Sequence, residues 1–120
     1  MTDLLTTAEQ EKLIEKAKRR VRNTNLMITF LTRAQIEVYF RKSFQVRDML
    51  VSAAFCFKQI DLICINLDVF SGLGEVSRLF VLEHELAHLM HQNITEEHLI
   101  DSIALENMLC SGEAVHQIEM

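Results

Sequence analysis

The sequence predicts an α+β domain, and three observations support this prediction. Apolar residues recur at helical spacing near the N-terminus, short strand-like runs occupy the middle third, and two further helical segments complete the chain. The chain has 120 residues, which fits a single domain over residues 1–120 built around one core. It is 49% hydrophobic and 24% charged, a composition typical of chains that fold rather than stay disordered.

The first predicted helix follows Thr6 and Thr7 and runs to about residue 22. Glu9 and Gln10 stand three residues after the two threonines, which is the spacing of a capping box. Apolar residues recur at helical spacing and can bury one face: Leu13, Ile14, Ala17 and Val21. The basic residues within 16–22 are therefore interpreted as the solvated face of this helix rather than a binding patch.

The middle third is predicted to form a short β-sheet. Residues 35–40 alternate in polarity and are rich in β-branched and aromatic side chains, as half-buried strands are. Residues 53–57 and 62–67 are two further apolar runs of strand length, joined by a turn at 58–61. Residues 43–52 fit a turn of helix or another strand.

Two helices are predicted after Gly72 and Gly74, over about 75–91 and 95–109. Thr95 is expected to cap the second helix, and Ile94 to pack on Leu99 as a hydrophobic staple. The acidic residues at 96 and 97 favour the positive end of this helix, and residues 111–112 end it.

The first of these two helices carries the residues that indicate chemistry. His84 and His88 are four residues apart, which places His88 about 40° beyond one full turn from His84 around the helix axis. Both side chains therefore project from one face of the helix. Two imidazole nitrogens at this spacing can bind one zinc ion, which favours tetrahedral sites with an open position. Glu85 lies beside that face, where it can accept a proton from a water that the metal activates.

A zinc site with two histidines needs a third protein ligand. Glu97 is the preferred candidate because it lies in the first turn of the next helix, after a short turn that can fold the two helices together. Glu106 is its main competitor. Asp101 follows Glu97 by four residues on the same face, where it can accept a hydrogen bond from a ligating histidine. His91 and His98 are expected to line the site, and a third histidine ligand at one of these positions is an open alternative.

Residues 81–91, together with the strand 63–66 before them, resemble the ImmA/IrrE-type metallopeptidases of bacteria and their phages. In that family a strand ends near an Asn, a helix with HExxH follows, and a Glu-x-x-Ala-Asn pattern on the next helix supplies the third ligand. Glu97 starts a matching segment here, with Ile100 in place of Ala and Asp101 in place of Asn. The resemblance implies a gluzincin-like, zincin-type architecture with one zinc ion. It also implies cleavage of a protein that is often a DNA-binding repressor.

The sequence thus predicts a zinc metallopeptidase acting on a protein or peptide substrate, with Glu85 as the catalytic base. We expect an extended substrate to add to residues 62–67 as an edge strand. One alternative is a deformylase-like amidase with Cys56 or Cys64 as third ligand. Another is a catalytically silent protein of the same fold that sequesters a partner.

Charge, hydrophobic runs and cysteine spacing indicate the compartment and the partners of such a protein. The net charge of −5 gives no reason to expect nucleic-acid binding. No secretory signal or membrane-spanning run is visible, and the three cysteines form no CxxC pair. The sequence therefore predicts a cytoplasmic protein with reduced thiols and no membrane partner.

Overall fold

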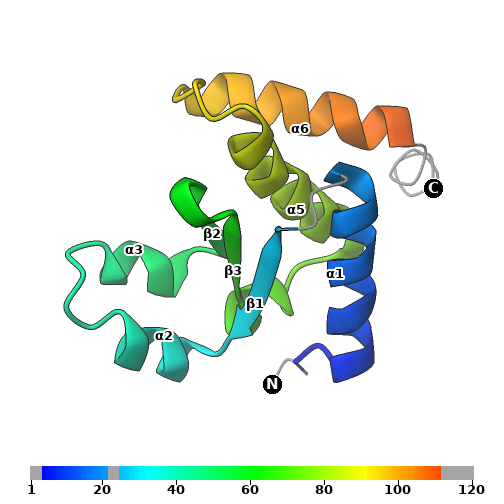
Figure 1. Cartoon of the computed structure of the whole chain (residues 1–120). Helices are drawn as coiled ribbons and strands as arrows, with labels where there is room; N and C mark the ends of the chain where they lie inside the picture. Colours follow the sequence, from blue (N-terminus) through cyan, green and yellow to red (C-terminus); the bar gives the residue numbers. More distant parts are fainter. Residues whose placement is uncertain (1–3, 22–24, 112–120) are drawn as a thin grey trace. The chain divides into compact units, whose positions relative to one another are not determined.

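The computed structural model describes residues 4–21 and 25–111, and it divides the chain into two compact units, Met1–Leu73 and Gly74–Met120. The described residues form six α-helices, one short 3₁₀ helix and a three-stranded sheet, so the predicted α+β class is confirmed (Figure 1). A single domain over residues 1–120 stays a prediction. None of the helices in the described ranges has the length and apolar character needed to cross a membrane.

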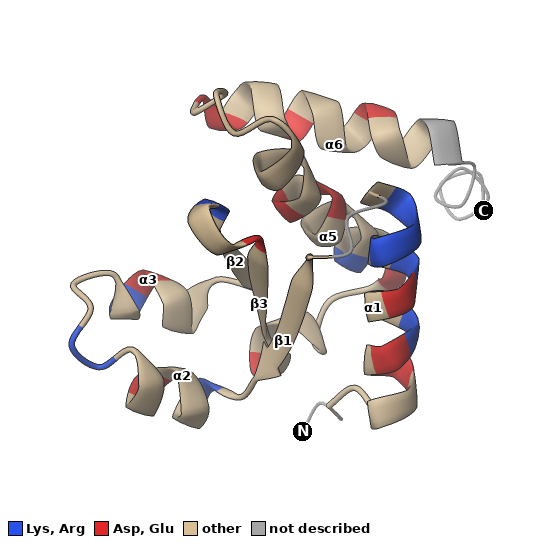
Figure 2. Cartoon of the chain, in the orientation of Figure 1, with Lys and Arg blue, Asp and Glu red and all other residues tan. Residues whose placement is uncertain are grey.

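Helix α1 (Thr7–Val21) begins where the capping box was predicted. The Thr6 backbone N–H donates to Oε1 of Glu9 at 3.0 Å, and the Glu9 N–H donates to Oγ1 of Thr6 at 3.2 Å. This reciprocal pair satisfies two backbone donors that the helix itself cannot satisfy. Ala17 is fully buried, and Figure 2 shows acidic and basic residues along the rest of α1, as expected for its solvated face.

The sheet has the order β1-β3-β2. Strand β3 (Leu62–Asn66) pairs in parallel with β1 (Met27–Leu31) and antiparallel with β2 (Ala54–Phe57). The two runs at 53–57 and 62–67 are therefore strands as predicted, whereas β1 was not anticipated. The prediction that residues 62–67 form an edge strand was wrong. Strand β3 has a partner on both sides, and its continuous apolar run reflects burial of both of its faces.

The prediction of a strand at residues 35–40 was also wrong, because helix α2 (Arg33–Tyr39) occupies this segment. A second capping box starts it: Gln35 N–H donates to Thr32 Oγ1 at 3.2 Å, and Thr32 N–H donates to Gln35 Oε1 at 2.9 Å. Ile36 is buried, while Val38 is exposed, so the alternation in sequence does not describe two faces of a sheet. Helix α3 (Val46–Val51) resolves the open segment 43–52 in favour of a helix turn.

One hydrophobic cluster of the first unit lies where α2 and α3 meet the sheet. Leu31, Ile36 and Met49 form a buried cluster, with partly buried hydrophobic residues packed against it: Phe40, Leu50, Phe55 and Phe57. The 3₁₀ helix η1 (Lys58–Ile60) joins β2 to β3, where the turn was predicted. Asp61 completes this turn in the left-handed region at φ 49°, which Asp tolerates better than most residues.

Asn66 ends β3, and its side chain forms hydrogen bonds with the backbone of two other segments. It is fully buried, and its Nδ2 donates to the carbonyl oxygens of Met49 and Leu50 at 3.2 and 3.1 Å. Its Oδ1 accepts the Val69 N–H at 3.4 Å and so caps helix α4 (Leu67–Phe70). The Asn at the end of the strand therefore supports the structure of the first unit.

The second unit is a pair of packed helices, α5 (Glu75–Met90) and α6 (Glu97–Ser111). Both were predicted with nearly these boundaries, although Gly112 lies outside the described residues. The cap of α6 differs from the prediction: the Glu96 carbonyl, one residue beyond Thr95, accepts the first helical N–H bond, from Ile100. Helix α6 buries Ile100, Ala104 and Met108, which recur at four-residue spacing.

Candidate metal centre

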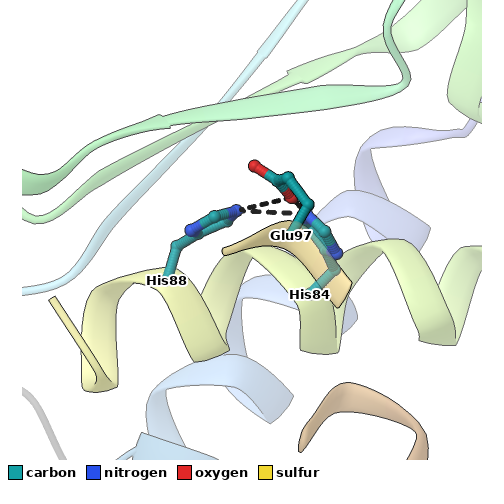
Figure 3. A group of neighbouring side chains, drawn as sticks. All are labelled: His84, His88 and Glu97. Carbon is teal, nitrogen blue, oxygen red and sulfur yellow. Dashed lines mark hydrogen bonds and ion pairs between the residues drawn. The ribbon is translucent and has the colours of Figure 1, made fainter. Parts of the chain in front are cut away.

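Helix α5 presents His84 and His88 one turn apart, and their rings lie close together (Figure 3). The ring centroids are 4.7 Å apart, and the two Nε2 atoms lie 3.1 Å from each other. The side chains are 20% and 12% exposed, so both rings are largely withdrawn from water while the site keeps some access. The helical spacing thus produces the shared face that the sequence predicted.

Glu97 is the first residue of α6, and it approaches both histidines from across the short turn. Its Oε2 atom lies 3.1 Å from Nε2 of His84 and 3.4 Å from Nε2 of His88. The carboxylate itself is 67% exposed. Two nitrogens and one oxygen therefore meet at one point, and these residues form the group in the described part of the chain whose donor atoms could hold a metal ion.

The spacing of these three atoms fits a tetrahedral zinc ion. Donor atoms bound at about 2.0 to 2.1 Å in tetrahedral geometry stand about 3.3 to 3.4 Å from one another. The three observed separations are 3.1, 3.1 and 3.4 Å. Two imidazoles and one carboxylate are also a donor set that zinc accepts in sites with an open fourth position. The residues present therefore fit the ion that the sequence pattern implies.

Asp101 fixes the orientation of the His84 ring. Its Oδ1 atom lies 2.8 Å from Nδ1 of His84. An ionised carboxylate only accepts hydrogen bonds, so Nδ1 carries the proton, and in the neutral ring the lone pair is on Nε2, facing Glu97 and His88. This is the partner that a metal-binding histidine needs on its second nitrogen.

Glu85, the predicted base, is buried on α5 with only 7% of its surface exposed. It follows His84 directly in the helix and precedes His88 by three residues. Its burial shields this carboxylate from bulk water.

The other predicted residues do not join the cluster. His98 is 76% exposed and pairs with Oε2 of Glu96 at 3.4 Å. His91 is exposed at the C-terminal cap of α5, and Glu106 is exposed on α6. Between the two candidate third ligands, the geometry thus brings Glu97 rather than Glu106 to the histidines.

The two cysteines of the deformylase-like alternative lie in the first unit, Cys56 on β2 and Cys64 on β3. Neither Cys56 nor Cys64 belongs to the group of described residues able to hold a metal. Burial raises the pKa of the Cys64 thiol to about 11. A metal ligand must be a thiolate, and burial in an apolar strand disfavours this form.

No known protein family, curated protein or solved structure matches this chain. One surface feature was not predicted: the basic and aromatic residues between α2 and α3. Residues 38–47 contain Arg41, Lys42 and Arg47 without an acidic residue, which was a visible signal. The assignment of these residues to a strand and an ambiguous segment obscured it.

Proposed function

We propose that this protein is a zinc-dependent peptidase of the ImmA/IrrE type, which cleaves a peptide bond in a protein inside the cell. The observation that carries the proposal is the convergence of His84, His88 and Glu97 at mutual distances of 3.1 to 3.4 Å. These three residues would hold the ion, and a DNA-binding repressor is the substrate class that the resemblance implies.

A proton could hold the same cluster together without a metal. A His84 ring protonated on both nitrogens would donate to Glu97 and to Asp101, which lie 3.1 and 2.8 Å from its two nitrogens. The donor chemistry favours the metal, because His88 also directs Nε2 at the same point, 3.1 Å from that of His84. Three lone-pair donors around one point are stabilised more completely by an ion that binds all three.

The chain's own residues have distinct roles in this proposal. Bound zinc would polarise the scissile carbonyl and activate the attacking water. Glu85 takes the proton from this water and delivers it to the leaving amine, as a general base and then a general acid. Asp101 keeps the His84 ring in one orientation and tautomer, so that Nε2 stays directed at the site.

The second candidate is a protein that binds a partner and does not cleave it. The observation that favours it is that Glu85 is buried, whereas His84 and His88 are both partly exposed. In that case the site would stabilise the pairing of α5 and α6, and the biological effect would come from sequestration.

The Glu85→Gln variant separates the two candidates. The probe is a peptide library made from digested bacterial protein, incubated with zinc-loaded protein and read by mass spectrometry for new cleavage sites. The peptidase proposal predicts cleavage by the native protein and a loss of about 10²- to 10⁴-fold in the variant, with zinc content unchanged. A zinc-loaded native protein that cuts no peptide would support the binding protein, and equal cleavage by the variant would remove Glu85 from the reaction.

A further inference from the structure

A phenylalanine stands one helical turn before the first histidine of the candidate metal centre, and the proposed ligands and base do not include it. Phe80 and His84 both belong to α5. Their ring centroids are 6.2 Å apart, and the ring planes meet at 47°. This separation lies within the range over which two aromatic rings attract one another. The Phe80 side chain therefore contacts the metal centre through a ring and not through a polar atom.

The contact follows from the direction of side chains on a helix. Each Cα–Cβ bond tilts toward the N-terminus, so a side chain covers the turn before its own residue. His84 thus leans over Phe80, and His88 leans over His84 with ring centroids 4.7 Å apart. His84 is therefore the middle one of three rings along α5, with the phenylalanine on one side and the second histidine on the other.

The carboxylates of α6 constrain the His84 ring in a different way. Asp101 and Glu97 approach its two nitrogens, but their side chains are 51% and 67% exposed. Side chains with this much exposure keep much of their rotamer freedom. The hydrogen bond with Asp101 sets which edge of the ring faces α6. Phe80 is partly buried and belongs to the same helix as His84, so its ring supplies a contact that is fixed to α5 itself.

We infer that Phe80 is a positioning residue, which holds the His84 ring in the orientation that directs Nε2 at the metal. Phe80 contacts neither the ion nor the substrate and acts through His84. A ring that is oriented in advance loses less conformational freedom when it binds an ion, so the contact raises metal affinity. The role in metal binding rests on the proposed function, whereas the restraint on the ring exists in the metal-free chain as well.

The first test is zinc affinity, measured on the full chain by competition with a zinc-binding dye. Phe80→Ala removes the ring and should weaken binding about fivefold, which is the typical strength of one aromatic contact. Phe80→Leu keeps most of the apolar volume, so it should stay folded and still weaken binding about threefold. Phe80→Tyr keeps the ring and should stay within about twofold of native affinity.

Leu79→Ala supplies the matched control. Leu79 is also partly buried on α5, and it points about 100° away from Phe80 around the helix axis. Its truncation removes apolar volume beside the same turn without removing the ring that contacts His84. This variant should keep native zinc affinity. A loss in Leu79→Ala as large as that in Phe80→Ala would overturn the inference, because general loosening of α5 would then explain both.

A second measurement needs no metal and separates this inference from the proposed function. In the metal-free protein, three-bond NMR couplings between the backbone and Cγ of His84 report whether its side chain occupies one χ1 rotamer or several. We expect one rotamer in the native protein and in Phe80→Tyr, and averaged couplings in Phe80→Ala and Phe80→Leu. Single-rotamer couplings in both of the latter variants would overturn the inference, and so would native zinc affinity in both. A native protein that binds no zinc would contradict the proposed metal centre, and the couplings alone would then decide whether Phe80 holds the ring.

Discussion

The Nδ1 atom of His84 lies 2.8 Å from Oδ1 of Asp101, and this contact joins the middle of α5 to the first turns of α6. Glu97, one turn earlier on α6, lies 3.1 Å from the opposite nitrogen of the same ring. One imidazole thus contacts two carboxylates through its two nitrogens. In the proposed metal centre, Glu97 would be a ligand and Asp101 the partner that orients the ring.

Replacing Asp101 by Ala should weaken zinc binding while leaving the three ligands in place. Without the carboxylate, the His84 ring loses the hydrogen bond that fixes its tautomer and orientation, and losses of this kind lower metal affinity about 10- to 100-fold. Competition against a zinc-binding dye measures the change. Glu106→Ala, an exposed carboxylate on the same helix, is the control and should keep native affinity. Equal affinities for the two variants would show that Asp101 does not orient His84.

Asn66→Asp should destabilise the first unit by about 3 kcal/mol or more, measured by urea unfolding. The ionised carboxylate cannot donate to the carbonyl oxygens of Met49 and Leu50, and it is charged at a fully buried position. Asn93→Asp makes the same chemical change at an exposed position after α5, so it should shift stability by about 0.5 kcal/mol or less. A small effect of Asn66→Asp would mean that water or movement of the chain replaces these bonds.

The Cys64 thiol should make the protein less stable as the pH rises from about 9 to 11. Burial raises its pKa from 9.0 to about 11, so in this range the unfolded chain has lost a proton that the folded chain still holds. Stability then falls by about 1.4 kcal/mol per pH unit, and it is not affected by this thiol below about pH 8. Urea unfolding at pH 8 to 11 should show this slope in the native chain and in Cys56→Ala. Cys64→Ala should remove it; the same slope in that variant would assign it to other groups.

Helix α1 and helix α5, which carries the two histidines, could be predicted because their signals are local. The Thr6–Glu9 box and the four-residue spacing of His84 and His88 each depend on a few neighbouring residues, and the structure contains both arrangements. The same kind of box was present at Thr32 and Gln35. There the alternating pattern of the following residues was given more weight, although a fixed helix start is the more specific signal.

The order of the strands could not be predicted, because it depends on contacts between distant parts of the chain. The apolar run at Ile63–Ile65 fits a strand buried on both faces, but nothing local says which strands lie beside it. Its parallel partner β1 begins at Met27, far earlier in the sequence. The preference for Glu97 over Glu106, in contrast, followed from the short turn before α6, and the structure brings Glu97 to the two histidines.

Zinc content is the most direct test of the proposed metal centre. The native protein, His88→Ala, Glu97→Ala and the control Glu106→Ala are stripped with a chelator, dialysed against zinc and analysed for the element. We predict about one zinc per chain in the native protein and in Glu106→Ala, and a large loss in the other two variants. A native protein without zinc, or full zinc content in both His88→Ala and Glu97→Ala, would contradict the proposed metal centre and the peptidase built on it.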